Sequence, residues 1–248
     1  LKGEKVVAGK TEEEIYKALG MRYVEPEIRE DRGEIELSKS GKLPKLIEYG
    51  SLQGDLQVQS EWTDGADSIE SLSRAAMKIG LSYIAITDHT KRLAMTNGLD
   101  EKRIRKQMAE IDKLNKKLKG KFTILKGSEC DILKDGTLDL SDDVLKDLDV
   151  VGISVHSHFS LSKNDQMARL KRAMENPHAD ILFHPTGRLI NKRKAIEIDI
   201  EELVNIAKKT GTILEIDSPP QRLDLKDEYV KKCTESGVKM SIDSDAHA

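Results

Sequence analysis

Cysteine is scarce in this 248-residue chain, and long hydrophobic runs are missing. The two cysteines, Cys130 and Cys233, lie far apart and form no CxxC pattern. This spacing is typical of a reduced intracellular protein and not of a disulfide scaffold, and we interpret both as core residues. No apolar run approaches the roughly 20 residues of a membrane span, and the first ten residues lack a signal-peptide core. We therefore expect a soluble, cytoplasmic protein without membrane contact.

The chain also lacks an excess of positive charge. Its 41 lysines and arginines stand against 44 acidic residues, for a net charge of −3, so any nucleic-acid contact must come from a local patch. G-x-S-x-G and P-loop patterns are absent, which weakens serine-hydrolase and nucleotide-kinase interpretations. Because the chain begins at Leu1 and stops one residue after His247, we expect it to be a fragment of a longer protein.

From residue 54 onward, short apolar runs alternate with amphipathic stretches. The apolar, β-rich runs are residues 54–60, 83–89, 122–132, 149–157, 179–185, 212–217 and 238–247. The helical patterns between them are residues 67–80, 100–119, 163–175, 199–210 and 226–236. This alternation is typical of βα units in a parallel sheet. It predicts an α/β fold, namely a distorted (β/α)7 TIM-like barrel.

Residues 1–53 show a different pattern. One helix is predicted over residues 11–19, and the rest, including the connector SKSGKLPKLIEYG, is interrupted by Pro26, Pro44 and several glycines. These interruptions argue against an independent core. We expect a small N-terminal element and linker over residues 1–53, followed by one barrel domain over residues 54–248.

Metal-ligand residue types stand at the C-terminal ends of successive predicted strands. In chain order they are His89, Glu129, His156, His184, Asp245 and His247. The C-terminal ends of barrel strands meet at one mouth, where active sites lie, and imidazoles and carboxylates are common ligands of zinc and related ions. Asp64 follows the first strand and can turn back over the same mouth. One such histidine alone would carry little weight, but the whole set predicts a metal cluster.

The period of two along a strand adds detail to this prediction. Gln57 and Gln59 are expected to share one face, as are Glu129 and Asp131, and Cys130 points the opposite way. His178 precedes its strand, so we expect it on the opposite end of the barrel in a structural role.

The motifs that contain these residues resemble the signature motifs of PHP (polymerase and histidinol phosphatase) domains. They are, in order, DLQVQSEWTDG, AITDHT, GSECDI with DGTLDL, SVHSHF, FHPTGRL and SIDSDAH. The segments AGKTEEEIYKALGMRYVEPEIREDRGEIE, DQMARLKRAMENP and QRLDL are similar to bacterial and archaeal family X DNA polymerases in particular. The resemblance implies a PHP-type (β/α)7 barrel that follows the end of a polymerase thumb, with nuclease or phosphatase activity at DNA 3′ ends.

The same resemblance implies up to three divalent metal ions, zinc or manganese. The first would lie near Gln57, Gln59, Glu129 and Asp245, the second near Glu129, His156 and His184, and the third near Asp64, His89 and His247. Glu129 and Asp245 would be the catalytic carboxylates. The family's His-x-His is here Gln57-Val58-Gln59, and an amide oxygen is a poorer zinc ligand than an imidazole. The first site is therefore predicted to be weak or empty, with the alternative that its two amide oxygens and two carboxylates hold a harder ion such as Mn²⁺ or Mg²⁺.

Basic residues follow the same strand ends. Lys91 and Arg92 come after His89, Arg188 follows His184, and Arg222 follows the sixth strand. We expect these four side chains to bind substrate phosphate, which suits the planar fork of arginine. The basic run in the predicted helix 100–119 is interpreted mainly as a solvated face.

These features together predict a metal-dependent phosphoesterase that acts on DNA 3′ ends in repair, as the 3′–5′ exonuclease of a family X DNA polymerase. The expected partners are DNA and the polymerase core of the same polypeptide. Two alternatives stay open. Gln57 and Gln59 favour a catalytically degenerate barrel that serves as a DNA-binding or structural module, and the family resemblance also allows a small-molecule phosphomonoesterase of the histidinol-phosphatase kind.

Overall fold

The computed structural model describes residues 5–248 and divides the chain into two compact units, Leu1–Ser51 and Leu52–Ala248. Within the described residues, no helix combines the length and the apolar character that crossing a membrane requires.

The first unit contains α1 (Glu12–Ala18), the 3-10 helix η1 (Pro26–Ile28) and α2 (Glu34–Ser40). Helix α1 matches the predicted helix. Helix α2 was missed, because the glycines on either side of it were interpreted as breaks in a connector. Gly33 and Gly41 instead stand at the two ends of α2 with left-handed φ values of 95° and 72°, a conformation that glycine adopts without strain.

Arg29 connects the elements of this first unit. Its Nη2 atom lies 2.7 Å from Oε2 of Glu12, and its guanidinium stacks over the rings of Tyr16 and Tyr23. Val24 is the one apolar residue among the described part of this unit that is fully buried. The unit is therefore held by polar and cation–π contacts more than by a hydrophobic core.

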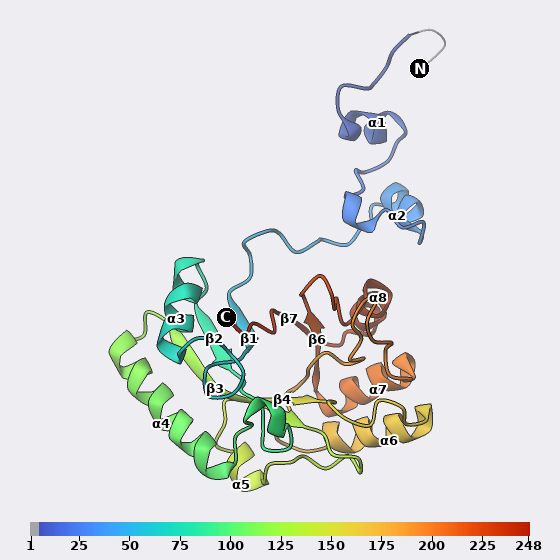
Figure 1. The fold of residues 1–248 in the computed structure, drawn as a ribbon. Coiled ribbons are helices and arrows are strands. Elements are labelled where there is room, and N and C mark those ends of the chain that lie inside the picture. The colour runs from blue at the N-terminus through green and yellow to red at the C-terminus, as the bar shows by residue number, and fades with distance from the viewer. Residues whose placement is uncertain (1–4) are drawn as a thin grey trace. The chain divides into compact units, whose positions relative to one another are not determined.

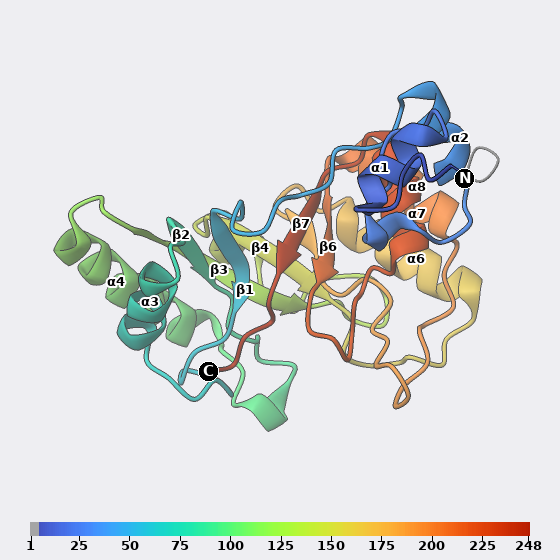
Figure 2. The same ribbon diagram turned by 90° about the horizontal axis from the view of Figure 1, so that it is seen from above.

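The second unit is a seven-stranded parallel sheet in chain order (Figure 1, Figure 2). Its strands are β1 (Gly54–Val58), β2 (Tyr83–Ile86), β3 (Thr123–Asp131), β4 (Val150–Ser154), β5 (Ile181–Leu182), β6 (Ile213–Asp217) and β7 (Met240–Asp243). Just beyond β7, Ala246 forms a parallel bridge with Val58, and its carbonyl accepts a hydrogen bond from the backbone N–H of Gln59 at 2.8 Å. These contacts bring the first and last strands together, and the predicted (β/α)7 barrel is confirmed.

Helices pack around the barrel between the strands (Figure 2). They are η2 (Ala94–Thr96), α3 (Ile69–Lys78), α4 (Glu101–Leu118), α5 (Asp142–Leu145), α6 (Lys163–Met174), α7 (Ile200–Thr210) and α8 (Asp227–Ser236). The five long helices agree with the sequence pattern, and the short α5 and η2 were not predicted. The side chains of Asp100 and Asp199 accept backbone hydrogen bonds at the starts of α4 and α7, as helix N-caps do.

Apolar residues fill two regions of the barrel. One lies between strands and helices and includes Cys130 and Cys233, both fully buried, as expected for core cysteines. The other lies inside the barrel and contains Leu125, Val150, Ile181, Phe183 and Ile213. A Cβ atom on Gly152 would come within 1.8 Å of the Phe183 ring, so glycine at that position makes room for the ring.

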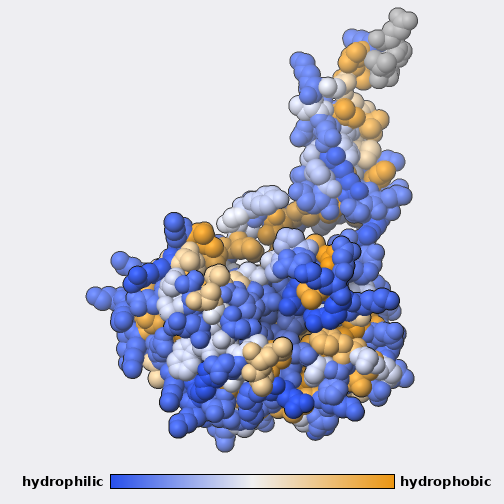
Figure 3. Space-filling view, in the orientation of Figure 1, coloured by the Kyte–Doolittle hydropathy of each residue, from blue (hydrophilic) through white to orange (hydrophobic). Residues whose placement is uncertain are grey.

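The outer surface of the barrel is mostly hydrophilic on the face that Figure 3 shows, with scattered hydrophobic residues. Scattered exposed apolar residues are normal for a globular domain. The polar chemistry that distinguishes this chain is therefore inside the barrel mouth.

Candidate metal centre

The inward side chains of the barrel change from apolar to polar toward the C-terminal ends of the strands. On β3 the inner face runs from Leu125 to Glu129, and on β6 it runs from Ile213 through Glu215 to Asp217. Side chains two residues apart on a strand point to the same face of the sheet, so these residues all face the barrel interior. The barrel interior is thus apolar toward the N-terminal ends of the strands and polar at the mouth, which their C-terminal ends form.

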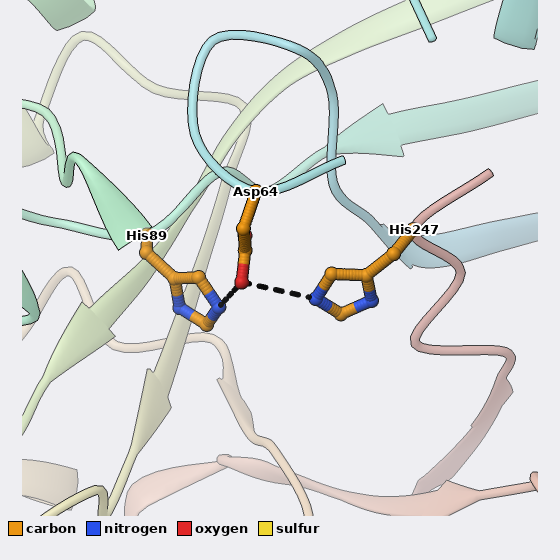
Figure 4. A group of neighbouring side chains, drawn as sticks. All are labelled: Asp64, His89 and His247. Carbon is orange, nitrogen blue, oxygen red and sulfur yellow. Dashed lines mark ion pairs between the residues drawn. The ribbon is translucent and has the colours of Figure 1, made fainter. Parts of the chain in front are cut away.

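The first cluster at this mouth consists of Asp64, His89 and His247 (Figure 4). These residues follow β1, β2 and β7, respectively. Oδ2 of Asp64 lies between the two rings, 3.6 Å from Nε2 of His89 and 3.5 Å from Nε2 of His247. One carboxylate and two imidazoles are a typical ligand set for zinc or manganese.

Asp88 fixes the loop that carries Asp64. Its carboxylate accepts hydrogen bonds from the backbone N–H of Ser60 at 2.9 Å, from the hydroxyls of Ser60 and Thr63, and from Nε2 of Gln107 at 2.6 Å. Burial raises the pKa of Asp88, although these donors oppose the rise. Asp88 was not among the predicted site residues, although its position directly before His89 was a signal for it.

Glu129 is the centre of the second cluster and has no solvent-exposed side-chain surface. Its Oε1 atom lies 2.8 Å from Nε2 of His184 and 3.0 Å from Nε2 of His156. Its Oε2 atom lies 3.3 Å from Nδ1 of His89 and accepts a hydrogen bond from Nε2 of Gln59 at 3.0 Å. Side chains from β1, β2, β4 and β5 therefore converge on one carboxylate.

The electrostatics of the site reflect this convergence. Burial alone would raise the pKa of Glu129, but the imidazoles of His89, His156 and His184 outweigh it and hold the pKa well below its usual value. Burial would lower the pKa of His156, but Glu129 and Asp131 raise it to about 10. The Asp64 carboxylate raises the pKa of His247 to about 9. Protons on His156 and His247 thus supply positive charge of the kind that bound cations would supply, and metal binding would displace them.

The second ring nitrogen of two histidines is held by an oxygen. Nδ1 of His156 lies 3.2 Å from Oδ1 of Asp131, and Nδ1 of His247 lies 2.8 Å from the backbone carbonyl oxygen of Asp245. Metal-binding histidines commonly have this arrangement, because it fixes the tautomer and turns Nε2 toward the ion. Asp131 was expected on the same face as Glu129, and it supports the site through His156.

His89 belongs to both clusters, since Glu129 and His156 also lie within metal-binding reach of it. A neutral imidazole ligates one ion through one ring nitrogen. Nε2 of His89 faces Asp64, and Nδ1, the other ring nitrogen, faces Glu129. The structure thus brings Asp64, His89 and His247 together in one group and His89, Glu129 and His156 in another, and His184 contacts the same Glu129 carboxylate.

The two glutamines bind carboxylates through hydrogen bonds. Both are fully buried, and Gln59 donates to Glu129. The Gln57 amide faces Glu215, and in the orientation that points its nitrogen at that carboxylate, the nitrogen lies 2.7 Å from Oε1. Glu215 was not among the predicted site residues, although it stands two residues before Asp217 on the same face of β6. Burial and the nearby Asp243 raise the pKa of Glu215 well above its usual value.

Asp245 forms an ion pair with Arg222. Nη2 of Arg222 lies 3.1 Å from Oδ2 of Asp245, and its Nε lies 3.0 Å from Oδ2 of Asp217. Burial and the charge of Asp245 raise the pKa of Asp217 to about 8, although Arg222 opposes the rise. The guanidinium is therefore an internal cation between two carboxylates.

The other three basic residues predicted to bind substrate have different surroundings. Arg188 donates from Nε to the carbonyl of Arg222 at 2.9 Å and from Nη2 to the carbonyl of Leu223, so it holds the loop after β6. Nζ of Lys91 lies 2.5 Å from Oε1 of Glu101. Arg92 is exposed beside the mouth.

Comparison with known protein families gives two matches along the chain. The model described as PHP domain matches residues 55–219, and the model described as DNA polymerase beta thumb matches residues 1–30. The first match covers more than half of the chain.

Two curated relatives represent two kinds of protein. The chain is 46% identical over 237 residues to the DNA polymerase/3′-5′ exonuclease PolX of Bacillus subtilis, which covers 96% of this chain and 41% of that protein. It is 31% identical over 191 residues to a probable phosphatase of Thermoanaerobacter, which covers 73% of this chain and 72% of that protein. The chain thus spans less than half the length of the polymerase relative.

A solved structure shows the same fold. Histidinol phosphate phosphatase from Lactococcus lactis, in complex with zinc, L-histidinol and phosphate, superposes with a TM-score of 0.59 at 17% identity and covers 79% of this chain and 87% of that chain. At this identity the likeness concerns the fold alone. The match over residues 55–219 establishes that this chain belongs to the PHP domain family, and the identity with PolX confirms its resemblance to family X DNA polymerases.

Proposed function

We propose that this chain is a metal-dependent phosphoesterase that removes nucleotides from DNA 3′ ends, as a 3′–5′ exonuclease. The observation that carries the proposal is the convergence of His89, His156 and His184 on the buried carboxylate of Glu129. Packing of the barrel does not require three imidazoles around one buried carboxylate, but these are the side chains that ligate a divalent cation.

Zinc or manganese ions are the proposed cofactors. Asp64, His89 and His247 would hold one ion, and Glu129, His156 and His184 would hold another. Bound ions of this kind polarise a phosphate and lower the pKa of a coordinated water, which supplies the nucleophile. The protein's own contribution is to fix the ligands, and Asp88 and Asp131 do this through their hydrogen bonds.

The DNA substrate is supported by the identity with PolX of Bacillus subtilis, which is named a 3′-5′ exonuclease. We assign the exposed Arg92, and Lys91 beside it, to phosphate contacts at the mouth, since neither lies inside the metal centre. The match of residues 1–30 to a polymerase thumb supports two further proposals. Residues 1–53 are a thumb-like segment and linker before a PHP domain at residues 54–248, and the polymerase core of the same polypeptide is the partner.

A small-molecule phosphomonoesterase is the second candidate. The relatives named probable phosphatases, one of which is 31% identical over 73% of this chain, favour it. A degenerate barrel that only binds DNA remains the third, because Gln57 and Gln59 replace the imidazoles of the family motif.

One assay separates these three candidates. Single-stranded DNA labelled at its 5′ end would carry either a 3′ hydroxyl or a 3′ phosphate, and the chain would be tested with Mn²⁺, Mg²⁺ and Zn²⁺ in separate reactions. Progressive shortening of both strands is the expected result. Removal of the terminal phosphate without shortening would favour the phosphomonoesterase. An unchanged strand under all three metals would exclude the exonuclease. The same reactions with p-nitrophenyl phosphate would then separate a small-molecule phosphomonoesterase, which releases phosphate, from the degenerate barrel, which does not.

A matched pair of variants ties the activity to the metal centre. His184→Ala removes a proposed ligand and should abolish shortening. His178→Ala removes a histidine that follows α6, at the N-terminal end of β5, and should leave the rate unchanged. Equal activity in both variants would exclude the proposed site as the source of cleavage.

A further inference from the structure

We infer that the first ion position of the family, between the two glutamines, Glu129 and Asp245, is closed in this chain by its own hydrogen-bond donors, so that the chain binds two ions. The inference concerns the number of bound metals. It rests on the two ion positions of the proposed function but not on the proposed DNA substrate. It also rests on three contacts, namely those of Gln59 with Glu129, of Gln57 with Glu215, and of Arg222 with Asp245.

The first contact is the amide of Gln59 on Glu129. Nε2 of Gln59 donates to Oε2 at 3.0 Å, and both side chains are buried. A glutamine ligates a cation only through its oxygen, because the amide nitrogen is a donor. With the nitrogen on Glu129, the oxygen is turned away from that carboxylate. Turning the amide over would set two oxygen acceptors against each other inside the protein, which is costly.

The second contact repeats this arrangement with Gln57 and Glu215. The amide nitrogen of Gln57, turned toward Glu215, lies 2.7 Å from Oε1 and 3.3 Å from Oε2. Glu215 also accepts a hydrogen bond from the backbone N–H of His184 at 2.5 Å. Both oxygens of this buried carboxylate therefore already have donors from the chain.

The third contact is the guanidinium of Arg222 on Asp245. Its Nη2 and Nε atoms reach Asp245 and Asp217 at 3.1 Å and 3.0 Å, and the Arg222 side chain is only 19% exposed. A cation that bound Asp245 here would lie next to a permanent positive charge. The guanidinium of Arg222 therefore already supplies positive charge at the position expected for an ion.

The chemistry of these donors distinguishes this position from the other two. An imidazole N–H gives up its proton when a metal arrives, so histidines can exchange a proton for an ion. An amide N–H keeps its protons, and a guanidinium is always charged in proteins. The clusters around His247 and His156 can therefore bind metal. An ion that used Glu129 and Asp245 beside the glutamines would instead have to displace the Gln59 amide and the Arg222 guanidinium from these carboxylates, and Oε1 of Gln59, which is buried without a hydrogen-bond partner, is a ligand atom that stays available.

The direct test is the metal stoichiometry of the full chain. After chelation and dialysis, the protein would be titrated with Mn²⁺ and with Zn²⁺ by calorimetry, and bound metal would be counted by elemental analysis. Two ions per chain is the expected result with each metal. Three ions bound to the unmodified chain would overturn the inference without the need for any variant.

Variants test the cause of the closure. The double variant Q57H/Q59H should bind a third ion weakly, because Arg222 still holds Asp245. Adding Arg222→Met to that variant should tighten the third ion by at least tenfold. Gln221→His places an extra imidazole at an exposed glutamine next to Arg222 and should leave the stoichiometry at two.

A further single variant covers the case in which the histidine variants do not fold, as judged by circular dichroism. Arg222→Met alone should still bind two ions, because the two amides remain. A third ion in this variant would show that the amides do not close the position. An inactive chain with two ions would overturn the proposed function only, and an active chain with three ions would overturn this inference only.

Discussion

Nε2 of His184 lies 2.8 Å from Oε1 of Glu129, and neither side chain exposes more than 3% of its surface. The backbone N–H of the same histidine donates to Glu215. His184 thus links the carboxylate that faces the imidazoles with the carboxylate that faces Gln57. The end of β5 thus connects the cluster of imidazoles, which can bind metal, with the position beside the two glutamines, which the chain's own donors close.

Replacing Glu129 by glutamine should remove metal from the second cluster. The change keeps the shape of the side chain but removes the charge on which three imidazoles converge. Because even supporting residues of metal sites typically contribute 10–100-fold in affinity, we expect a loss of at least about 100-fold in affinity and in 3′ cleavage. Calorimetric titration with Zn²⁺ checks the affinity, and unchanged binding would contradict the assignment of Glu129.

Asp131→Asn should weaken metal binding through His156, because the amide is a poorer partner for Nδ1 than the carboxylate 3.2 Å away. We expect a 10–100-fold loss of affinity, as is typical for a residue that orients a metal-binding histidine. The matched control is Asp135→Asn, an exposed aspartate on the loop after β3. The two variants should differ clearly in metal titrations, and similar affinities would show that Asp131 has no positioning role.

Removal of metal should lower the melting temperature. A ligand that binds only the native state at 100 times its Kd stabilises it by about 2.7 kcal/mol, which for a domain of this size corresponds to about 5–10 °C. Differential scanning calorimetry with and without a chelator measures the change, and the Glu129→Gln variant should respond much less. An identical melting curve after verified metal removal would count against bound ions.

The stability of the metal-free chain should decrease as the pH rises from 6.5 to 9. The folded pKa of His156 is raised to about 10 and that of His247 to about 9. Their contribution is complete below their ordinary pKa of 6.5 and is lost as the pH approaches the raised values. The raised pKa of Asp217, about 8, acts in the same direction, because the folded state keeps its proton longer.

Thermal melts of the chelated protein at several pH values in this range check the prediction. The metal-saturated protein should show a smaller slope, because its imidazoles have already lost their protons. Equal slopes with and without metal would contradict the proposed ligands.

Arg92→Ala should weaken DNA binding without affecting the metal count. We expect a several-fold higher KM, an unchanged kcat, and a salt dependence reduced by about 0.7 in the slope of log K, as for the loss of one contact to single-stranded DNA. Lys121→Ala is the control, since this exposed lysine precedes β3 at the opposite end of the barrel. A lower kcat with unchanged salt dependence would argue against a phosphate contact.

The sequence by itself determined the barrel and the kind of chemistry at its mouth. Short apolar, β-rich runs that alternate with amphipathic helical stretches predicted the strands, and His89, His156 and His184 could be placed at one end because parallel strands end together. The glycines around α2 were misinterpreted, since the same residue type breaks a helix and also flanks its ends.

Only the tertiary structure decided which side chains meet. Strand periodicity gives the face of a residue but not its partner across the barrel, so the pairing of Gln57 with Glu215 could not be derived from spacing. Arg188 and Arg222 both follow strand ends, yet one binds a loop backbone and the other enters the site. The direction of a long side chain on a loop depends on the acceptors that folding brings near it. The acceptors of Arg188 lie 34 and 35 residues further along the chain, and Arg222 reaches Asp245 on the segment after β7, so local sequence does not place them.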